Sequence, residues 1–190
     1  MLLNFSEYRK DYLAKPFDMS HSDPDPLIQF AEWFKNAEEA GIDEPNAMTL
    51  ATGNTEGRIS ARIVLLKAVE NGAFVFFTNY GSKKGLELEE NPRASLVFFW
   101  KELARQVRVE GKVSKIDPEA STAYFQSRPK GSQVGAWASP QSTVIPDRNY
   151  LEERVLKLDE QFSSSEKLPR PEFWGGYGLS PDWIEFWQGR

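Results

Sequence analysis

The chain has 190 residues, of which 40% are hydrophobic and 13% aromatic, and a formal net charge of −5 at pH 7. This length suits one domain with a sizeable core, and the acidic balance argues against general nucleic-acid binding, which needs a broad basic face. The sequence has no cysteine and a single histidine, His21, which excludes disulfides and thiolate chemistry and argues against a zinc site or a Ser-His triad.

The N-terminal residues lack the basic start and the apolar stretch of a signal peptide, and no apolar run approaches the ~18 residues of a membrane span. We therefore expect a cytoplasmic protein without membrane segments. Residues 1–24 are polar and interrupted by prolines, and we interpret them as a mobile arm carrying the cluster Arg9-Lys10-Asp11-Tyr12. Asp25 and Pro26 then provide an N-cap and a first-turn proline, so a helix is predicted from there to Gly41.

From Ala47 onwards the pattern is typical of strands joined by short turns, as expected for an antiparallel sheet. Asn71-Gly72 is a strong hairpin signal, and a short helical stretch is predicted at Gly85–Glu90. This many short strands tend to close into a barrel. The predicted strands are Ala47–Thr52, Arg58–Lys67, Ala73–Thr78, Arg93–Trp100 and Arg105–Ile116.

The last third is predicted to be mainly helical before a final pair of strands. Phe173–Gly178 and Asp182–Gln188 are interpreted as a hairpin turned at Leu179-Ser180-Pro181. No internal repeat is evident, so residues 25–190 are predicted to form a single domain, with 172–190 as its C-terminal hairpin. Helices are predicted at Glu119–Ser127, at Gly131–Ser139 and after a cap at Asp147.

One hexapeptide, Arg62-Ile63-Val64-Leu65-Leu66-Lys67, is interpreted as a strand buried on both faces with a cation at each end. In a regular strand the two cations lie ~16 Å apart, because each residue rises ~3.3 Å, and alternation places them on opposite faces. A core strand whose charged ends reach water is the simpler interpretation. The alternative is that the strand holds two anionic groups apart, with a flat ligand between them.

The first candidate anion site combines Arg62 with Lys83 and Lys84, which lie in a glycine-containing turn that leads into a helix. Free backbone amides and the helix dipole add to the positive charge there, and Thr78 offers a hydroxyl. This set suits a dianionic phosphate. A solvated basic turn is the alternative.

The second candidate anion site contains Tyr124, Arg128 and Ser132, each four residues from the next. Tyr124 and Arg128 are expected on one helix face, and a phenol, a guanidinium and a hydroxyl together suit a phosphate or a carboxylate. Lys67 can complete this group. The alternative is a helix end with an exposed arginine.

Amides and aromatic rings accompany these cations, at Gln106, Gln141-Ser142 and Trp187-Gln188. They suit hydrogen bonding and stacking to a heteroaromatic ring. The sequence offers no evident nucleophile, no paired carboxylates and no Rossmann or Walker loop, so no catalytic acid or base is assigned. Chemistry performed by a bound organic cofactor fits best.

These motifs together resemble the pyridoxamine (pyridoxine) 5′-phosphate oxidase family, in order from about Arg9 to Arg190. Each motif is modest alone, and their joint occurrence in register is specific. They are Arg62-Ile63-Val64-Leu65-Leu66-Lys67, Phe77-Thr78-Asn79-Tyr80-Gly81-Ser82-Lys83-Lys84, Arg105-Gln106-Val107, Tyr124-Phe125-Gln126-Ser127-Arg128-Pro129, Gly135-Ala136-Trp137 and Ile184-Glu185-Phe186-Trp187-Gln188-Gly189.

The resemblance implies a mainly β fold with peripheral helices (α+β), an antiparallel FMN-binding split barrel, in a homodimer with FMN at the subunit interface. It places the substrate phosphate on Lys67, Tyr124, Arg128 and Ser132, and Arg9 and Tyr12 in an arm that closes over the substrate. It places FMN, partly through the partner subunit, on Arg62, Ile63, Val64, Leu65, Leu66, Lys67, Phe77, Thr78, Lys83, Lys84, Gln106, Gln141, Ser142 and Trp187.

The implied reaction is oxidation of pyridoxamine or pyridoxine 5′-phosphate to pyridoxal 5′-phosphate by O₂, with release of H₂O₂. The family continues past Trp187-Gln188-Gly189 with a segment that contacts substrate and FMN, whereas this sequence stops at Arg190. Two explanations stay open: a trimmed sequence, or a shortened variant that binds flavin or pyridoxal phosphate without turnover. A third hypothesis is a split-barrel reductase that uses a nicotinamide cofactor, against which the group around Arg128 argues.

Overall fold

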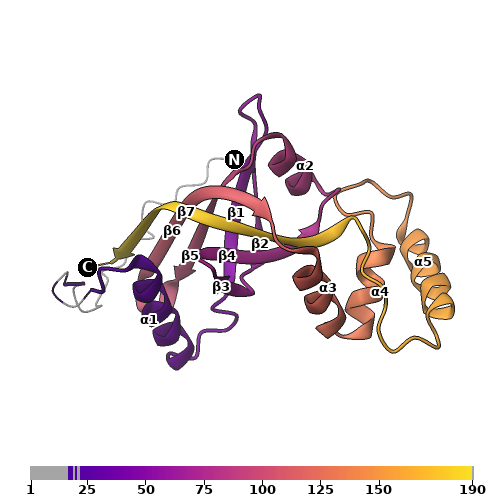
Figure 1. Cartoon of the computed structure of the whole chain (residues 1–190), viewed down its shortest axis with the longest axis horizontal. Helices are drawn as coiled ribbons and strands as arrows, with labels where there is room; N and C mark the ends of the chain where they lie inside the picture. Colours follow the sequence, from indigo (N-terminus) through magenta and orange to yellow (C-terminus); the bar gives the residue numbers. More distant parts are fainter. Residues whose placement is uncertain (1–16, 19, 21, 190) are drawn as a thin grey trace, which may run out of the picture.

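The computed structural model describes residues 17–18, 20 and 22–189. One helix precedes four consecutive strands, and three helices are grouped between the last two strands (Figure 1). In order, the elements are α1 (Pro26–Glu39), β1 (Ala47–Gly53), β2 (Ile59–Leu65), β3 (Ala68–Glu70), β4 (Ala73–Asn79), α2 (Lys83–Glu90), β5 (Arg93–Trp100), a 3-10 helix (Lys101–Leu103), β6 (Arg105–Lys115), α3 (Pro118–Ser127), α4 (Lys130–Ala138), α5 (Arg148–Gln161) and β7 (Trp174–Gln188).

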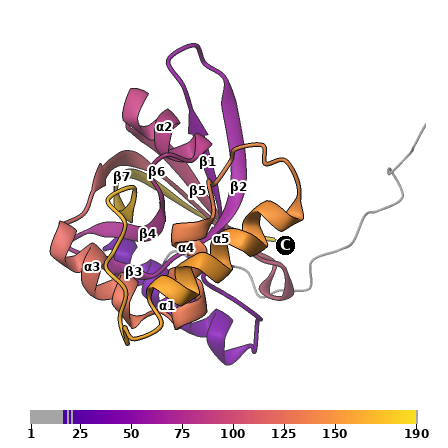
Figure 2. The same ribbon diagram turned by 90° about the vertical axis from the view of Figure 1, so that its right-hand side faces the viewer.

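The strands form one antiparallel sheet in the order β2-β1-β5-β6-β7-β4-β3, which curls into a half-barrel (Figures 1 and 2). The short strand β3 pairs only with Ala73–Val75 of β4. The rest of β4 therefore lacks a partner on that side and approaches β2 across the split. The predicted antiparallel split barrel is confirmed.

The core lies between α1 and the concave face of the sheet. The Phe30 ring of α1 lies 4.9 Å from the ring of Phe74 and 5.0 Å from that of Phe98, measured between centroids. The predicted limits of this helix are confirmed, because Asp25 accepts the Leu27 N–H and Gly41 adopts a left-handed φ of 69°. Burial of these aromatic side chains holds α1 on the sheet.

Helices α3, α4 and α5 gather at the other end of the sheet, where Figure 2 shows α4 and α5 in front of the strands. A second cluster of buried apolar side chains joins them to the start of β7. Asp117 and Asp147 cap α3 and α5 as predicted, by accepting backbone N–H groups of the first turn. The cluster contains Phe125, Val134, Leu168 and Trp174.

The interpretation of Arg62–Lys67 as a strand buried on both faces is wrong. Strand β2 ends at Leu65 and lies at the edge of the sheet, where the Ile63 side chain points outward and is 65% exposed. The chain then turns, and the Lys67 N–H donates to the carbonyl of Val75. Because the strand stops before Lys67, alternation no longer separates this lysine from Arg62, and both side chains line one cavity.

The predicted C-terminal hairpin is also wrong. Strand β7 is continuous from Trp174 to Gln188, and pairs first with β4 and then with β6. Pro181 lies opposite Gly111, where the register of β6 shifts. A proline, which lacks an N–H, is tolerated at such an irregularity, so Pro181 does not turn the chain.

The structure describes residues 17–18, 20 and 22–24 of the predicted N-terminal arm. The Phe17 ring packs edge-on against Trp33 of α1, with 5.1 Å between centroids. Arg9, Tyr12 and His21 lie outside the described residues. Within the described part of the chain, no helix combines the length and the apolar character needed to cross a bilayer.

Candidate functional site

A cavity of about 670 Å³ lies in the split of the half-barrel. Strand β2 forms one wall and β4 another, and the remaining lining residues come from α2, α3, α4, the loops after β2, α3 and α4, and the start of β7. Its size is typical of a site for a small molecule or cofactor. The lining residues are Arg62, Ile63, Val64, Leu65, Lys67, Phe77, Thr78, Lys84, Tyr124, Arg128, Pro129, Ser132, Gln141 and Trp174.

Lys84 lies in the first turn of α2, where the side chain of Ser82 caps the helix. Its side chain is buried, and its Nζ donates to Thr78 Oγ1 at 3.0 Å, to Ser82 Oγ at 3.1 Å and to Gln141 Oε1 at 2.9 Å. Burial, followed by the charge of Arg62, lowers the pKa of Lys84 to about 8, while Glu87 acts in the opposite direction. An anion at this position would stabilise the protonated amine.

Arg62 reaches the same region from β2. Its Nη1 donates to Leu50 O at 3.3 Å and to Thr52 Oγ1 at 2.5 Å, and its Nη2 donates to Ser60 Oγ and to Glu87 Oε2 at 3.4 Å. Burial alone raises the pKa of Glu87, but hydrogen bonds from Thr52 and Ser60 and the charge of Arg62 outweigh it, so the pKa is lowered. The buried carboxylate is therefore ionised and paired.

Arg128 follows α3 and lies beside a stack of aromatic rings. Its Cζ lies 4.8 Å from the ring centroid of Trp174, and the Phe77 and Tyr124 rings stack with 3.9 Å between centroids. Burial lowers the pKa of Arg128, and Tyr124 acts in the opposite direction. The Arg128 Nη1 is buried without a hydrogen-bond partner among the described residues. A half-buried guanidinium whose buried Nη1 has an unused donor suits an anionic ligand.

Most members of both predicted anion groups meet in this one cavity. Lys83 does not line it: its side chain is exposed and its Nζ lies 3.9 Å from Glu87 Oε1. Leu66 is buried in the core, and Ser142 is exposed beside Gln141. Gln106 and Trp187 pair with each other near the far end of β7. The predicted residues that the structure brings together are Arg62, Ile63, Val64, Leu65, Lys67, Phe77, Thr78, Lys84, Tyr124, Arg128, Ser132 and Gln141.

Three residues near the cavity were not predicted. Trp174 and Pro129 line it, and Glu87 lies behind Arg62. Glu87 follows Lys83 by four residues, so helical spacing alone indicates that the two share a face of α2. Nothing in the sequence around Trp174 distinguishes a ring that lines a cavity from one in the core.

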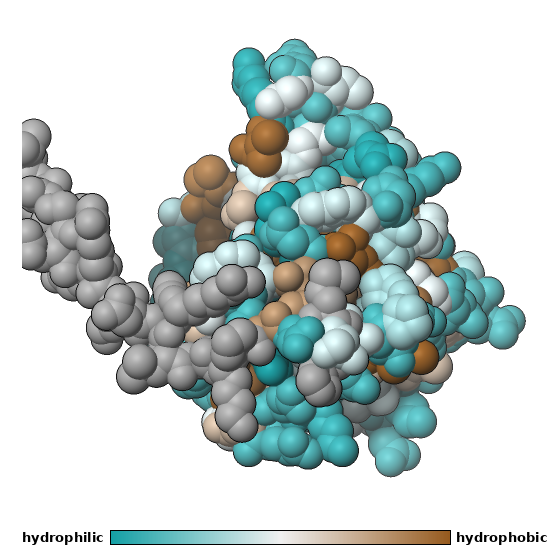
Figure 3. All heavy atoms as spheres, turned by 90° about the vertical axis from the view of Figure 1, so that its left-hand side faces the viewer, coloured by the Kyte–Doolittle hydropathy of each residue, from teal (hydrophilic) through white to brown (hydrophobic). Residues whose placement is uncertain are grey.

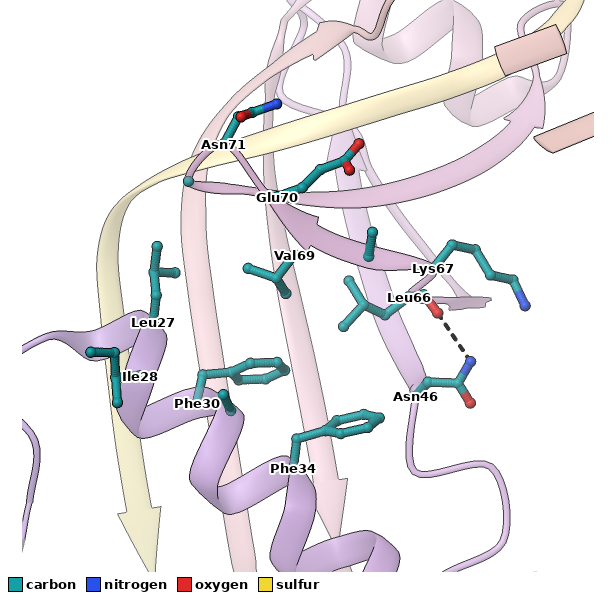
Figure 4. Close-up of a pocket in the computed structure, with 13 residues that line it drawn as sticks. Leu27, Ile28, Phe30, Phe34, Asn46, Leu66, Lys67, Val69, Glu70 and Asn71 are labelled. Atoms are coloured by element: carbon teal, nitrogen blue, oxygen red, sulfur yellow. Dashed lines mark hydrogen bonds between the residues drawn. The ribbon is translucent and has the colours of Figure 1, made fainter. Parts of the chain in front are cut away.

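A second cavity, of about 500 Å³, lies between α1 and the β3–β4 hairpin (Figure 4). Its walls are the apolar side chains of Leu27, Phe30, Phe34 and Val69. The Asn46 amide, at its edge, already donates to the carbonyl of Leu66. This cavity lacks the convergent polar groups that orient a ligand, so the cavity in the split is the better candidate.

A protein-family model described as pyridoxamine 5′-phosphate oxidase matches residues 34–162. The chain is 57% identical over 185 residues to a pyridoxine/pyridoxamine 5′-phosphate oxidase of Paraburkholderia phymatum, covering 97% of this chain and 86% of the relative. It is 54% identical over 190 residues to the enzyme of that name from a Cyanothece species, covering 100% of this chain and 89% of the relative. The chain belongs to the pyridoxamine 5′-phosphate oxidase family.

Solved structures agree with this assignment. PhzG from Burkholderia lata, crystallised with tetrahydrophenazine-1-carboxylic acid, superposes with a TM-score of 0.85 at 29% identity, over 93% of this chain and 87% of PhzG. An FMN-binding, pyridoxamine 5′-phosphate oxidase-related protein of Nostoc punctiforme has a TM-score of 0.65 at 16% identity, over 86% and 85% of the two chains, and supports the fold alone. Family membership supports a flavin cofactor and oxidase chemistry.

The depressed pKa of Lys84 gives a prediction that needs no ligand. In the folded protein the amine should titrate near pH 8 rather than at its ordinary value of 10.5. Arg62→Ala should raise this pKa and Glu87→Gln should lower it, because the arginine opposes the protonated amine and the glutamate favours it. NMR titration of isotope-labelled lysines, assigned with Lys84→Arg, measures the midpoint; a midpoint unmoved by either substitution would contradict the electrostatic account.

The lowered pKa of Lys84 also makes the stability of the fold depend on pH. The unfolded chain keeps the Lys84 proton up to about pH 10.5, whereas the folded protein releases it near pH 8. Between these values the unfolded state binds more protons, so the contribution of Lys84 to the free energy of unfolding rises with pH.

Proposed function

We propose that this protein is an FMN-dependent oxidase that converts pyridoxamine or pyridoxine 5′-phosphate to pyridoxal 5′-phosphate, with O₂ as acceptor and H₂O₂ as product. The observation that carries the proposal is the cavity in the split, where cations of two separate groups face one space. One group surrounds Lys84, and the other surrounds Arg128 and its unpartnered Nη1. Two phosphorylated ligands, a cofactor and a substrate, need such an arrangement.

The residues around Lys84 fit the phosphate of FMN. Lys84 brings a buried ammonium group, Thr78 a hydroxyl and Arg62 a fixed positive charge. The free edge of β2 adds the backbone groups of Ile63 to Leu65 along the cavity wall. These residues would hold the phosphate and support the ring system of the cofactor.

The group around Arg128 fits the phosphate of the substrate. Tyr124 and Ser132 line the cavity with it, and Lys67 enters from the end of β2. The stacked rings of Phe77 and Tyr124 add a flat apolar wall. With its phosphate held by cations, a pyridine ring is restrained in position, and such orientation is one of the contributions that a protein makes when a cofactor performs the chemistry.

Bound FMN would supply the redox chemistry, by accepting a hydride equivalent from the C4′ carbon of the substrate and returning the electrons to O₂. The protein's own groups bind and orient the two ligands and exclude water. Among the described residues that line the cavity there are cations and hydroxyl groups but no carboxylate, so its wall complements anionic ligands in charge.

Gln106 and Trp187 support a homodimer with the cofactor at the subunit interface. They lie opposite one another on β6 and β7, thirteen residues along β7 from Trp174, which lines the cavity. At ~3.3 Å per residue this is roughly 40 Å measured along the strand. If both belong to a flavin site, as the resemblance implies, a second copy of the chain must supply them.

The outer face of the sheet offers a surface for that second copy. Cross-strand pairing places exposed apolar side chains of β2, β5 and β7 on this one face. Figure 3 shows apolar residues reaching the surface among hydrophilic ones at the end of the molecule where β7 finishes. Exposed apolar patches of this kind mark interaction surfaces. The exposed side chains that strand pairing places on the outer face are Ile59, Ile63, Phe99, Trp183 and Trp187.

Anaerobic reduction tests the proposed activity. FMN-loaded protein should lose its visible flavin absorbance when mixed with pyridoxamine 5′-phosphate, and readmitted O₂ should restore the absorbance while pyridoxal 5′-phosphate and H₂O₂ appear. Pyridoxamine without the phosphate should reduce the flavin poorly, because it has no anion for Arg128. A flavin that binds but is reduced by neither phosphorylated vitamer would favour a binding protein without turnover.

Two substitutions separate the cation groups. Arg128→Ala should raise the KM for pyridoxamine 5′-phosphate about ten- to a hundredfold with little loss of FMN, as expected for loss of a hydrogen bond to a charged group. Lys84→Ala should instead raise the dissociation constant of FMN by a similar factor. Flavin titration and steady-state kinetics on the two variants measure this split, and equal loss of flavin in both would contradict the assignment.

Phe99→Glu tests the dimer. Phe99 is 57% exposed on the outer face of the sheet, and a carboxylate buried there at an interface would lack a partner. The mass measured by light scattering should fall to that of one chain, with weaker FMN binding. Leu156→Glu, on the exposed face of α5, is the matched control and should stay dimeric. A Phe99→Glu variant that remains a dimer with full FMN affinity would rule out this interface.

A further inference from the structure

Helix α2 places one buried acid beside the cations at the proposed FMN phosphate. The Glu87 side chain is only 8% exposed, although Glu89 of the same helix is 67% exposed. Its Oε2 accepts from Thr52 Oγ1 at 2.5 Å and from Ser60 Oγ at 2.7 Å. A buried carboxylate beside an anion-binding site opposes the anion, so its presence there needs a physical reason.

The contacts of Arg62 provide that reason. An arginine has five N–H donors, and four hydrogen bonds from the two Nη atoms of Arg62 end on Leu50 O, Thr52, Ser60 and Glu87. Its Nε–H has no acceptor among the described residues. The guanidinium is therefore held in one orientation, with its charge at the wall of the cavity.

Glu87 joins these contacts into one network. Thr52 and Ser60 each accept from Arg62 and donate to Glu87, so both hydroxyls depend on the carboxylate as their acceptor. Without it, the two hydroxyls lose the group that orients them, and Arg62 loses its only anionic partner among the described residues. A long arginine side chain then regains rotamer freedom, which must be lost again when an anion binds.

We propose that Glu87 is a positioning residue, which fixes Arg62 in the orientation that receives the phosphate of the cofactor. This inference rests on the proposed FMN function. Glu87 acts on the phosphate in two opposite ways: its charge repels the anion, and its hydrogen bonds hold Arg62 in place. The proposal is that the second effect dominates.

Apo-protein titrated with FMN and with riboflavin, which lacks the phosphate, measures this role without turnover. The ratio of the FMN affinity to the riboflavin affinity measures what the phosphate contributes to binding. General damage to the fold lowers both affinities alike and leaves this ratio unchanged. Glu87→Gln keeps an acceptor and removes the charge, so it should retain the wild-type ratio or exceed it. Glu87→Leu removes both and should lower the ratio about tenfold or more, since a hydrogen bond to a charged group is lost.

A double-mutant cycle tests whether Glu87 acts through Arg62. In an Arg62→Ala background, Glu87→Leu should cause no further loss of the ratio. Glu90→Leu, on the exposed side of α2, is the matched control and should leave the ratio unchanged. A Glu87→Leu protein with the wild-type ratio, or with the same loss in the Arg62→Ala background, would overturn the proposal. A wild-type protein that binds FMN no better than riboflavin would instead refute the cofactor assignment itself.

Discussion

The burial of cations around one cavity is the constraint on which the rest of the site depends. A charge removed from water needs a partner, and each of the cations at this cavity has partners of a different kind. Arg62 is paired with the ionised Glu87, whereas Lys84 is surrounded by three neutral oxygens and has a pKa of about 8. Arg128 rests on aromatic rings and keeps a donor without a partner among the described residues. The cavity is thus a local cationic site in a chain whose net charge is −5.

The topology of the sheet makes this site possible. Because β3 is only three residues long, it covers one end of β4 and leaves the other end free toward β2. Edge strands expose unpaired backbone groups, which proteins usually cover and which here line a cavity. Strand β7 starts at this cavity with Trp174 and ends paired with the first residues of β6, so one strand connects the cavity with the outer apolar face of the sheet.

Local signals in the sequence predict the elements better than they predict burial. The Asn71-Gly72 turn depends on backbone conformations that few residues adopt, and both residues do have positive φ. The aliphatic run from Arg62 to Lys67 indicates a strand, but aliphatic residues alone do not distinguish a central position in the sheet from the edge position that β2 has. Pro181 was misinterpreted because a proline marks a turn and a bulge alike. The two cation groups were predicted from residue types and spacing, and the resemblance added most of the other predicted residues that line the cavity, whereas Glu87 was missed although its helical spacing from Lys83 was available.

The two proposed anion sites differ in the hydrogen bonds that a ligand must displace. In the structure Gln141 Oε1 accepts from both Lys84 and Thr78, so a phosphate oxygen at that position takes over hydrogen bonds that already exist. The exchange is favourable because a charged acceptor binds an ammonium group more strongly than an amide does. It also raises the pKa of Lys84, so the amine keeps its proton above pH 8 when an anion is bound. At Arg128 no such exchange is needed for Nη1, since this donor has no partner to give up among the described residues. An anion there gains a hydrogen bond outright, because Nη1 gives up no acceptor in the described part of the chain when the anion binds.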